Sequence, residues 1–279
     1  MGDSVLTSGF WSRYTRHKVF GPSATNNAEK FGQTLLKELE RTNANSQKAV
    51  LFPMEDASLN WVAKHRELVE RHAYLLIPPP EALKIAQDKG RTLGLATELG
   101  IPCPKTWEPK SAMEFTEIVL SMPIGSFIVK PRSGSGSMGV SYGDSRTAKA
   151  WQDIWAKFGA MLIQERVPPE GRGQGVSLLM DGNGKCVATF VHERLQQYPN
   201  SGGPSSDRKS IHAPQLLEWS LALLHRLQWR GVAMVEWKLD PRDGKPKLME
   251  INPRFWGSLE LAVRAGVDFP TLYARAAMC

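Results

Sequence analysis

Apolar side chains recur at helical spacing along several stretches of the chain. In residues 28–41, Phe31, Leu35, Leu36 and Leu39 are separated by charged and polar residues. An α-helix has about 3.6 residues per turn, so this spacing predicts an amphipathic helix with one buried face. Similar patterns predict further helices over residues 59–71, 81–99, 148–158, 214–228 and 255–266.

Between these helices, short apolar or alternating runs predict β-strands. They are residues 49–54, 74–77, 127–130, 161–167, 175–180, 185–195, 232–239 and 247–251. Turn-forming residues join the last four of these strands into two hairpins, at residues 181–184 and at residues 240–244. The alternation of strand and helix in the first 80 residues is typical of the βα units of an α/β fold.

Three consecutive prolines, Pro78, Pro79 and Pro80, separate the first 80 residues from the rest of the chain. Neither a helix nor a strand continues through such a run. Glu55 and Asp56 follow the first predicted strand, at the end where α/β proteins bind ligands. Acids are also common at the start of a helix, and we interpret these two residues in that way.

The composition is typical of a folded protein without a membrane span. Apolar residues make up 42% of the chain and charged residues 23%. The longest apolar runs fall well short of the ~20 residues that cross a bilayer, and no secretory signal is visible, so we expect a cytoplasmic protein. The cysteines Cys103, Cys186 and Cys279 lie far apart, which argues against a disulfide framework or a structural zinc site.

The charge of the chain leaves two classes of partner open. The net charge is +7, but the 35 Lys and Arg residues are spread along the chain instead of forming a basic tract. A nucleotide with three phosphates needs a positive site, just as nucleic acid does, so charge alone does not separate ATP from DNA. A nucleic-acid-binding protein would bind less tightly as salt increases, whether or not Mg·ATP is present.

The last predicted hairpin carries a candidate metal site. Side chains alternate between the two faces of a strand, so Glu236 shares a face with Lys238, and Glu250 shares a face with Asn252. If these faces coincide, two carboxylates and an amide oxygen meet, which is a ligand set that suits Mg²⁺ or Mn²⁺. The alternative is that both glutamates are solvated and that Lys238 is their ion-pair partner.

Residues 132–140, with the sequence Arg-Ser-Gly-Ser-Gly-Ser-Met-Gly-Val, form a candidate phosphate loop. Glycine allows successive backbone amides to point toward phosphate oxygens. The loop is neither a Walker A loop nor the Gly-x-Gly-x-x-Gly of a Rossmann helix, and a simple linker is the alternative. A second Gly and Ser run at residues 201–206 lies between Arg194 and Arg208, and a surface loop is the alternative there.

A candidate base-binding segment ends the predicted strand at residues 161–167, just before Pro168 and Pro169. The edge of adenine needs one donor and one acceptor side by side, and exposed backbone next to proline supplies both. We therefore assign the base to Glu165, Arg166 and Val167.

From about Asp88 to Pro270, the order of these motifs resembles the ATP-grasp superfamily. The resemblance is carried by Asp88-Lys89 ahead of a Gly-Ile-Pro-x-Pro run, by Lys130 ahead of the glycine loop, and by Glu-Ile-Asn-Pro-Arg at residues 250–254. It is greatest to bacterial carboxylate–amine ligases. The ATP-binding folds of biotin carboxylase and of the large chain of carbamoyl-phosphate synthase are related to them.

The resemblance implies roles for individual residues. Glu236, Glu250 and Asn252 would bind Mg²⁺ or Mn²⁺, and Arg254 and Arg194 would act in catalysis. Glu170 is nearest to the family's ribose-binding Glu, although Arg172-Gly173-Gln174 departs from the family pattern. The full ATP-binding set would be Lys89, Lys130, Ser133, Gly134, Ser135, Gly136, Ser137, Gly139, Glu165, Arg166, Val167 and Glu170.

The resemblance also implies an α/β fold with α+β lobes, the ATP-grasp fold, and a domain organisation. Residues 1–80 would form a Rossmann-like pre-ATP-grasp domain, and residues 81–279 an ATP-grasp domain with a lid at about 105–165 and a metal-binding core at about 168–279. The usual opening strand, Gly-rich turn and helix are not visible in the first domain. We therefore expect the first domain to be incomplete at its start, and the second to be incomplete at its end.

The expected function is that of an ATP- and Mg²⁺-dependent ligase, which joins a carboxylate to an amine through an acylphosphate. The alternatives are a catalytically impaired ATP-binding regulatory module and, less favoured, a basic nucleic-acid-binding protein. The expected partners are small-molecule carboxylate and amine substrates, without a membrane or nucleic acid, and a homodimer is left open.

Overall fold

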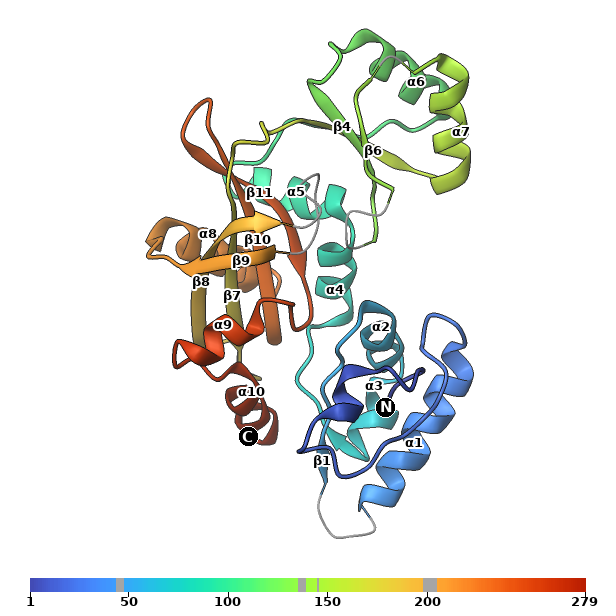
Figure 1. The fold of residues 1–279 in the computed structure, drawn as a ribbon, viewed down its shortest axis with the longest axis vertical. Helices are drawn as coiled ribbons and strands as arrows, with labels where there is room; N and C mark the ends of the chain where they lie inside the picture. Colours follow the sequence, from blue (N-terminus) through green and yellow to red (C-terminus); the bar gives the residue numbers. More distant parts are fainter. Residues whose placement is uncertain (44–47, 135–138, 145, 198–204) are drawn as a thin grey trace.

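The computed structural model of the chain describes residues 1–43, 48–134, 139–144, 146–197 and 205–279. Within these residues the strands form a two-stranded, a four-stranded and a five-stranded sheet. The four-stranded and two-stranded sheets lie at opposite ends of the molecule, with the five-stranded sheet between them (Figure 1). The mixture of helices and sheets confirms the predicted α/β fold class.

The front segment contains the two-stranded parallel sheet and several helices. In chain order its elements are η1 (Ser8–Trp11), α1 (Ala28–Asn43), β1 (Ala49–Val50), α2 (Asp56–Lys64), α3 (Arg66–Glu70) and β2 (Ala73–Tyr74). The single helix predicted over residues 59–71 is wrong, because the backbone leaves the helical conformation at His65. Leu59, Val62 and Val69 from both pieces are buried in one cluster, so the apolar spacing did not reveal the break.

The predicted helix over residues 81–99 is also two helices, α4 (Pro80–Gln87) and α5 (Lys89–Glu98). Asp88 between them has an extended backbone, and its side chain accepts a hydrogen bond from Arg91 N at 3.1 Å. Asp is a preferred N-cap residue, because its side chain satisfies an amide that the first helical turn leaves free. This break makes Lys89 the first residue of α5.

The four-stranded sheet is antiparallel and is covered by two helices. Its strand order is β3 (Thr106–Trp107), β6 (Met161–Glu165), β4 (Phe127–Pro131) and β5 (Ser141–Tyr142). The helices are α6 (Ala112–Ser121), for which no sequence prediction was made, and α7 (Ala148–Phe158). Phe115, Phe127, Trp151 and Ile163 form the apolar core between helices and sheet.

The five-stranded antiparallel sheet has the order β11 (Lys245–Asn252), β10 (Gly231–Asp240), β7 (Gly173–Met180), β8 (Cys186–Gln197) and β9 (Ser205–Ser210). Residues 201–204 of the predicted second glycine loop lie outside the described residues. Residues 205 and 206 belong to β9, which pairs with β8, so the surface-loop alternative is wrong for these two residues.

The two faces of β10 have different surroundings. Val235 and Trp237 point into the main apolar core, where α4, α5 and α8 (Pro214–Arg226) cover the sheet. The Trp237 ring nitrogen donates to Ser220 Oγ on α8 at 3.1 Å, which fixes this face inward. Because side chains alternate, Met234 and Glu236 lie on the opposite face.

The opposite face is only partly covered. Met234 packs in a second apolar cluster with Phe269 and Tyr273 of α10 (Phe269–Met278), close to α9 (Leu259–Arg264). The helix predicted over residues 255–266 therefore begins later, at Leu259, because the bulky residues before it pack as a loop in this cluster. Glu236 remains beyond the covered end of the face.

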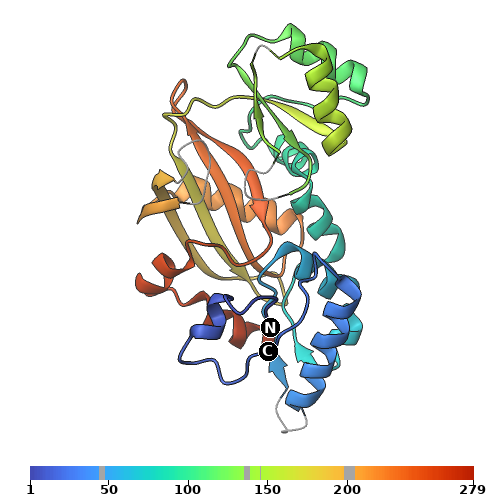
Figure 2. The same cartoon turned by 45° about the vertical axis from the view of Figure 1, so that its right-hand side comes forward.

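The front segment packs against the same C-terminal helices. The hydroxyl of Tyr273 donates to Leu51 O at 3.0 Å and accepts from Leu76 N at 3.3 Å. Leu76 also lies in the apolar cluster with Phe255 and Trp256. The two-stranded sheet and α10 lie at the same end of the molecule in both views (Figures 1 and 2).

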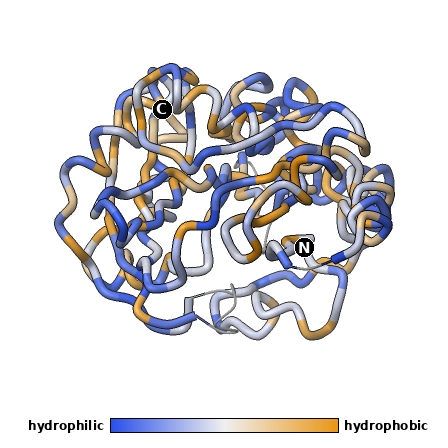
Figure 3. The backbone as a smooth tube through the Cα atoms, turned by 90° about the horizontal axis from the view of Figure 1, so that it is seen from above, coloured by the Kyte–Doolittle hydropathy of each residue, from blue (hydrophilic) through white to orange (hydrophobic). Residues whose placement is uncertain are grey.

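Apolar and polar segments alternate along most of the backbone (Figure 3). Among the residues that the structure describes, no helix is both long and apolar enough to cross a membrane.

Candidate nucleotide and metal site

A cleft of about 1090 Å³ lies between the four-stranded and five-stranded sheets. Its lining includes residues of β4 and β5, the end of β6 and the segment that follows it, the first residue of α5, and strands β7, β8, β10 and β11. The structure places eleven of the predicted site residues in this lining. They are Lys89, Lys130, Ser133, Gly134, Glu165, Arg166, Val167, Glu170, Arg194, Glu236 and Glu250.

The candidate metal ligands meet on one face of the β10–β11 hairpin. Glu236 lies directly opposite Glu250, and Met234 lies directly opposite Asn252. Opposite residues of an antiparallel pair project to the same side, so Asn252 and both glutamates share a face. The Asn252 amide donates to Glu236 Oε1 at 2.9 Å. The two strand faces therefore coincide, as the metal-site prediction required.

Cations already compensate these carboxylates. Arg194 Nη2 lies 2.7 Å from Glu236 Oε2, and Lys89 Nζ lies 3.4 Å from Glu250 Oε2. Lys238, the ion-pair partner in the alternative interpretation, instead donates to Val167 O at 3.2 Å. That alternative is wrong about the partner, because the neighbouring cations come from β8 and α5.

Burial raises the pKa of the Glu236 carboxyl, and the charge of Glu250 raises it further, whereas Arg194 opposes the shift. Two carboxylates held this close repel each other, and a divalent cation relieves that repulsion. Oxygen ligands of this kind suit Mg²⁺ or Mn²⁺. No group of three or more His, Cys, Asp or Glu suited to a metal occurs among the described residues, so two carboxylates and one amide would leave positions for water and phosphate.

Lys130 is a buried cation on the other side of the cleft. It is 5% exposed, and its ammonium donates to Gln164 Oε1 at 2.8 Å. The pKa of Lys130 is lowered to about 8, mainly by burial; the charge of Glu250 opposes this shift and the charge of Lys89 adds to it. A phosphate at this position would favour the charged form of the lysine.

Part of the glycine loop borders the same region. Ser133 and Gly134 line the cleft, and Gly134 O accepts a hydrogen bond from Lys89 Nζ at 2.6 Å. Ser135, Gly136 and Ser137 lie outside the described residues. Gly139 does not appear in the described cleft lining, and with a φ of +76° it holds a conformation that favours glycine.

The segment predicted to bind the base follows the end of β6. The amide of Glu165 donates to Lys105 O at 2.8 Å, and the amide of Arg166 donates to Ser126 O at 2.8 Å. The carbonyl of Val167 accepts the bond from Lys238 described above. These three backbone groups already bond within the protein, so base recognition would use the remaining groups of the segment.

Arg254 does not appear in the described cleft lining. Its Nε lies 3.4 Å from Asp56 Oδ1 in α2, and its Nη1 donates to Phe255 O at 3.0 Å. Asp56 lies in the first turn of α2, as expected for an acid at a helix start, but it also meets the predicted catalytic arginine. Asp56 follows a predicted strand, and this position was the one signal in the sequence that pointed to this contact.

The contacts of two other residues near the site were not predicted from the sequence. Gln164 holds Lys130, and Lys238 holds Val167. Gln164 lies on β6, which pairs with β4, and Lys238 lies on β10, which pairs with β7 as well as with its hairpin partner β11. Only the pairing of β4 with β6 and of β10 with β7 brings them next to the predicted residues.

Part of the chain matches a known protein family. Residues 158–278 match the model of a family described as ATP-grasp in the biosynthetic pathway with Ter operon. A search of curated proteins found no match for the chain.

Solved structures share the fold at low sequence identity. The biotin carboxylase domain dimer of Hydrogenobacter thermophilus 2-oxoglutarate carboxylase, in complex with MgADP, ADP and bicarbonate, is 15% identical with a TM-score of 0.67, covering 87% of this chain and 56% of that one. A Campylobacter jejuni biotin carboxylase–ATP complex is 14% identical with a TM-score of 0.67, at 87% and 57% coverage.

A third structure, Rhizobium etli pyruvate carboxylase, is 19% identical with a TM-score of 0.62, covering 87% of this chain and 22% of that one. The chain thus spans just over half the length of the two structures above and about a fifth of this one. Residues 158–278 thus match an ATP-grasp family model, and the chain shares its fold with these biotin carboxylase and pyruvate carboxylase structures.

Proposed function

We propose that the protein is an ATP-dependent ligase that joins a carboxylate to an amine through an acylphosphate. The observation that carries the proposal is the meeting of Glu236, Glu250 and Asn252 on one strand face, within reach of Lys89 and across a cleft from the buried Lys130. The structural relative from Hydrogenobacter thermophilus contains MgADP, which supports the use of ATP with Mg²⁺.

In this proposal Glu236, Glu250 and Asn252 hold Mg²⁺ or Mn²⁺, which supplies positive charge to the phosphates when it is bound. Lys130 and Lys89 bind phosphate oxygens, together with the backbone of the loop that begins at Ser133. The base binds at Glu165–Val167, and Glu170 binds the ribose. The cleft's volume of about 1090 Å³ is ample for a nucleotide and a small acid.

The chemistry has two steps. A carboxylate oxygen of the acid attacks the γ-phosphorus of ATP, a new P–O bond forms, the bond to the β-phosphate oxygen breaks, and ADP leaves. The amine nitrogen then attacks the acyl carbon and loses a proton, a C–N bond forms, and the C–O bond to the phosphate breaks. The lysines contribute by holding the phosphates in line for the first attack.

Two arginines stabilise the charge that develops. Arg194 now pairs with Glu236 at 2.7 Å, and a bound cation would take over that carboxylate and free the guanidinium for the transferred phosphoryl group. Arg254 pairs with Asp56 at 3.4 Å and would exchange this partner for the acyl substrate. Preorganised cationic donors of this kind stabilise oxyanions in the transition state.

One part of the chain would move during the reaction while another stays fixed. Residues 105–165, with the four-stranded sheet, serve as a lid over residues 168–279, and residues 1–80 form a front domain that supplies Asp56. Closure of the lid would exclude water, which otherwise hydrolyses an acylphosphate. We further propose a cytoplasmic location and small-molecule substrates. A homodimer remains a proposal as well, suggested by the dimer described for the Hydrogenobacter domain.

Hydroxylamine tests the central step, because it intercepts an acylphosphate and gives a hydroxamate. The protein is incubated with Mg·ATP, hydroxylamine and a panel of amino acids, short peptides and other carboxylic acids, and hydroxamate and ADP are measured. The expected result is equal amounts of hydroxamate and ADP with at least one acid. A protein that binds Mg·ATP but forms neither product with any acid would instead be a regulatory ATP-binding module.

A further inference from the structure

Two chain segments connect the four-stranded sheet and its helices to the rest of the molecule, and they meet at one point. One segment enters at Lys105 and the other leaves at Glu165. The amide of Glu165 donates to Lys105 O at 2.8 Å, and the amide of Lys105 donates to Glu165 Oε2 at 3.2 Å. The two connections are therefore bonded to each other, and we call this pair of residues the hinge.

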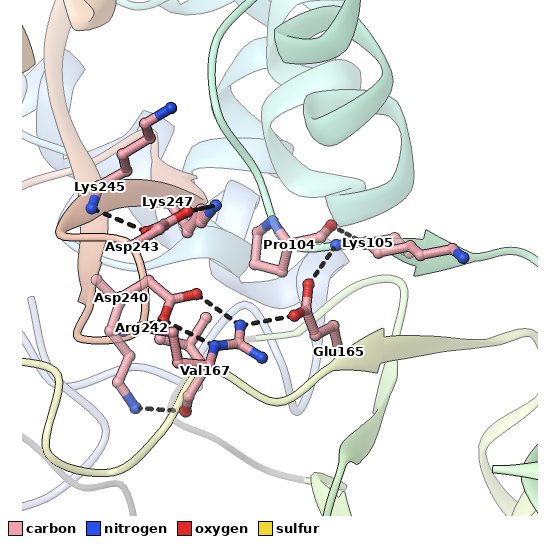
Figure 4. A network of polar contacts seen from close by, with 11 residues as sticks. Pro104, Lys105, Glu165, Val167, Asp240, Arg242, Asp243, Lys245 and Lys247 are labelled. Atoms are coloured by element: carbon pink, nitrogen blue, oxygen red, sulfur yellow. Dashed lines mark hydrogen bonds and ion pairs between the residues drawn. The ribbon is translucent and has the colours of Figure 1, made fainter.

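Arg242, in the turn between β10 and β11, reaches this hinge. Its Nη2 lies 2.6 Å from Glu165 Oε1. The same guanidinium donates through Nε to Asp240 Oδ1 at 2.9 Å and through Nη2 to Asp240 Oδ2 at 2.6 Å. Figure 4 shows Arg242 between the two carboxylates, with Lys105 on the far side of Glu165.

Asp240 holds the Arg242 side chain in place. Asp240 is the last residue of β10 and is 2% exposed, and the Arg242 hydrogen bond lowers the pKa of the Asp240 carboxyl to about 2. Asp240 is therefore charged at neutral pH and holds the guanidinium by two parallel bonds. The planar fork of Arg242 can then contact a second carboxylate without giving up the first, which the point charge of a lysine does less well.

The same hairpin holds the exit segment at further points. Lys238 Nζ donates to Val167 O at 3.2 Å, and the amide of Leu239 donates to Arg172 O at 3.0 Å. Lys238 and Arg242 therefore contact the two ends of the segment from Glu165 to Val167. The hairpin that makes these contacts also carries Glu236 on β10 and Glu250 on β11.

We infer that Arg242 is a positioning residue whose contact with Glu165 fixes the hinge of the lid to the hairpin that carries Glu236 and Glu250. This inference rests on the proposed function only for the ligand, because the hinge itself is independent of ATP. The contact keeps the base-binding segment at a set distance from the metal ligands. The site is therefore preorganised for a nucleotide whose base and phosphates are separated by that distance.

Other contacts also join the two sides of the cleft. Lys89 donates to Gly134 O, and Asp88 pairs with Arg132 at 2.9 Å. Lys89 belongs to the proposed phosphate site, so its contact would change when the nucleotide binds. The Arg242 contact lies at the hinge, outside the proposed phosphate site, and we expect it to persist when the nucleotide binds. Because the Arg242 side chain is 48% exposed, its pair with Glu165 contributes little to stability, and the main effect is on lid position.

Spin labels measure the position of the lid directly. One label is placed at the exposed Glu117 on α6 and the other at the exposed Ala222 on α8, in a chain whose three cysteines are replaced by serine. Arg242→Met should broaden the distance distribution between the labels about twofold without nucleotide, and Arg242→Lys should have an intermediate effect. The matched control is Lys247→Met, which removes the ion pair between Lys247 and Asp243 in the same hairpin without touching the hinge.

Calorimetric titration with Mg·ATP gives the second readout. Arg242→Met should weaken binding about fivefold, the effect of losing a contact of about 1 kcal/mol, while Lys247→Met stays within about twofold of the parent. Because Arg242 acts through Glu165, the effects of Arg242→Met and Glu165→Gln should not add. In turnover, Arg242→Met should raise KM for ATP and leave kcat nearly unchanged.

The outcomes separate the inference from the proposed function. If Arg242→Met and the parent give equal label distributions, the inference is overturned, whatever ATP does. A variant that only melts earlier, with unchanged distances and ATP affinity, also overturns it, because Arg242 would then be merely structural. If the parent binds no Mg·ATP, the proposed function fails, while the label distances still decide the role of Arg242.

Discussion

The two sheets that border the cleft each bury a charged group, and the two groups have opposite sign. In the four-stranded sheet, Lys130 has the neutral Gln164 as its hydrogen-bond partner, and burial lowers the pKa of its ammonium to about 8. In the five-stranded sheet, Glu236 lies opposite Glu250, and burial raises the pKa of its carboxyl. One side thus favours an added anion and the other an added cation, which is the charge pattern of a magnesium nucleotide.

The largest effect is expected beyond the end of β11, at Arg254. Replacing Arg254 by Met should lower the rate of hydroxamate formation by about two to three orders of magnitude, the usual loss for one preorganised charge-stabilising donor. ATP affinity should stay nearly unchanged, because Arg254 lies beside Asp56 and not in the described cleft lining. The check is a rate measurement paired with a binding titration. A variant that weakens only ATP binding would contradict the catalytic role.

Removing a carboxylate from the five-stranded side of the cleft should remove the metal dependence of the stabilisation by ATP. ATP at about 100 times its Kd stabilises a folded protein by about 2.7 kcal/mol, and we expect this stabilisation to be much larger with Mg²⁺ than with EDTA. Glu250→Gln should abolish that difference, because the amide lacks the negative charge that holds the cation. Thermal unfolding with ATP in both buffers gives the answer. Equal shifts in variant and parent, with ATP clearly bound, would sink the metal assignment.

Removing Lys130 from the four-stranded side of the cleft should have a smaller effect, which is measured as a change in proton uptake when Mg·ATP binds. The pKa of Lys130 is about 8 in the fold against 10.5 for the free side chain, so between these values the unfolded chain holds more protons and Lys130 makes stability rise with pH. A phosphate restores the charged form, so binding of Mg·ATP near pH 9 should take up close to one proton, about 0.9.

Calorimetry in buffers of different ionisation enthalpy measures this uptake. The control is Lys130→Met, which keeps the length of the side chain but cannot titrate, and its uptake should fall to near zero. If the variant takes up as many protons as the parent, another group is responsible and Lys130 does not contact the phosphates.

The hairpin site was predictable because its geometry is local. Strand alternation and one turn between neighbouring strands place Glu236 opposite Glu250, and both follow from residues close together in the sequence. The break at Asp88 was not predictable from apolar spacing, since α4 and α5 both face the same core. The contact between Arg254 and Asp56 joins residues far apart in the chain, and only tertiary packing creates it.

Several expectations from the sequence remain predictions. The roles of the site residues and the domain boundaries at residues 80, 105 and 165 remain predictions, because they concern ligand binding and the relative motion of the domains. Three of the predicted phosphate-loop residues, Ser135, Gly136 and Ser137, lie outside the described residues. The base segment at Glu165–Val167 was chosen for its exposed backbone, yet several of its backbone groups bond within the protein.

The β-bulge in the β10–β11 pairing determines where a residue can be lost from this hairpin without moving the site residues. Glu236 pairs with Glu250 but Trp237 pairs with Leu248, so Met249 is an extra residue on β11. Deleting Met249 would leave the two glutamates opposite each other. Deleting Ile251 would instead bring Asn252 opposite Val235 and turn its amide into the apolar core. Among related sequences, length variation is therefore expected at position 249 and excluded at position 251.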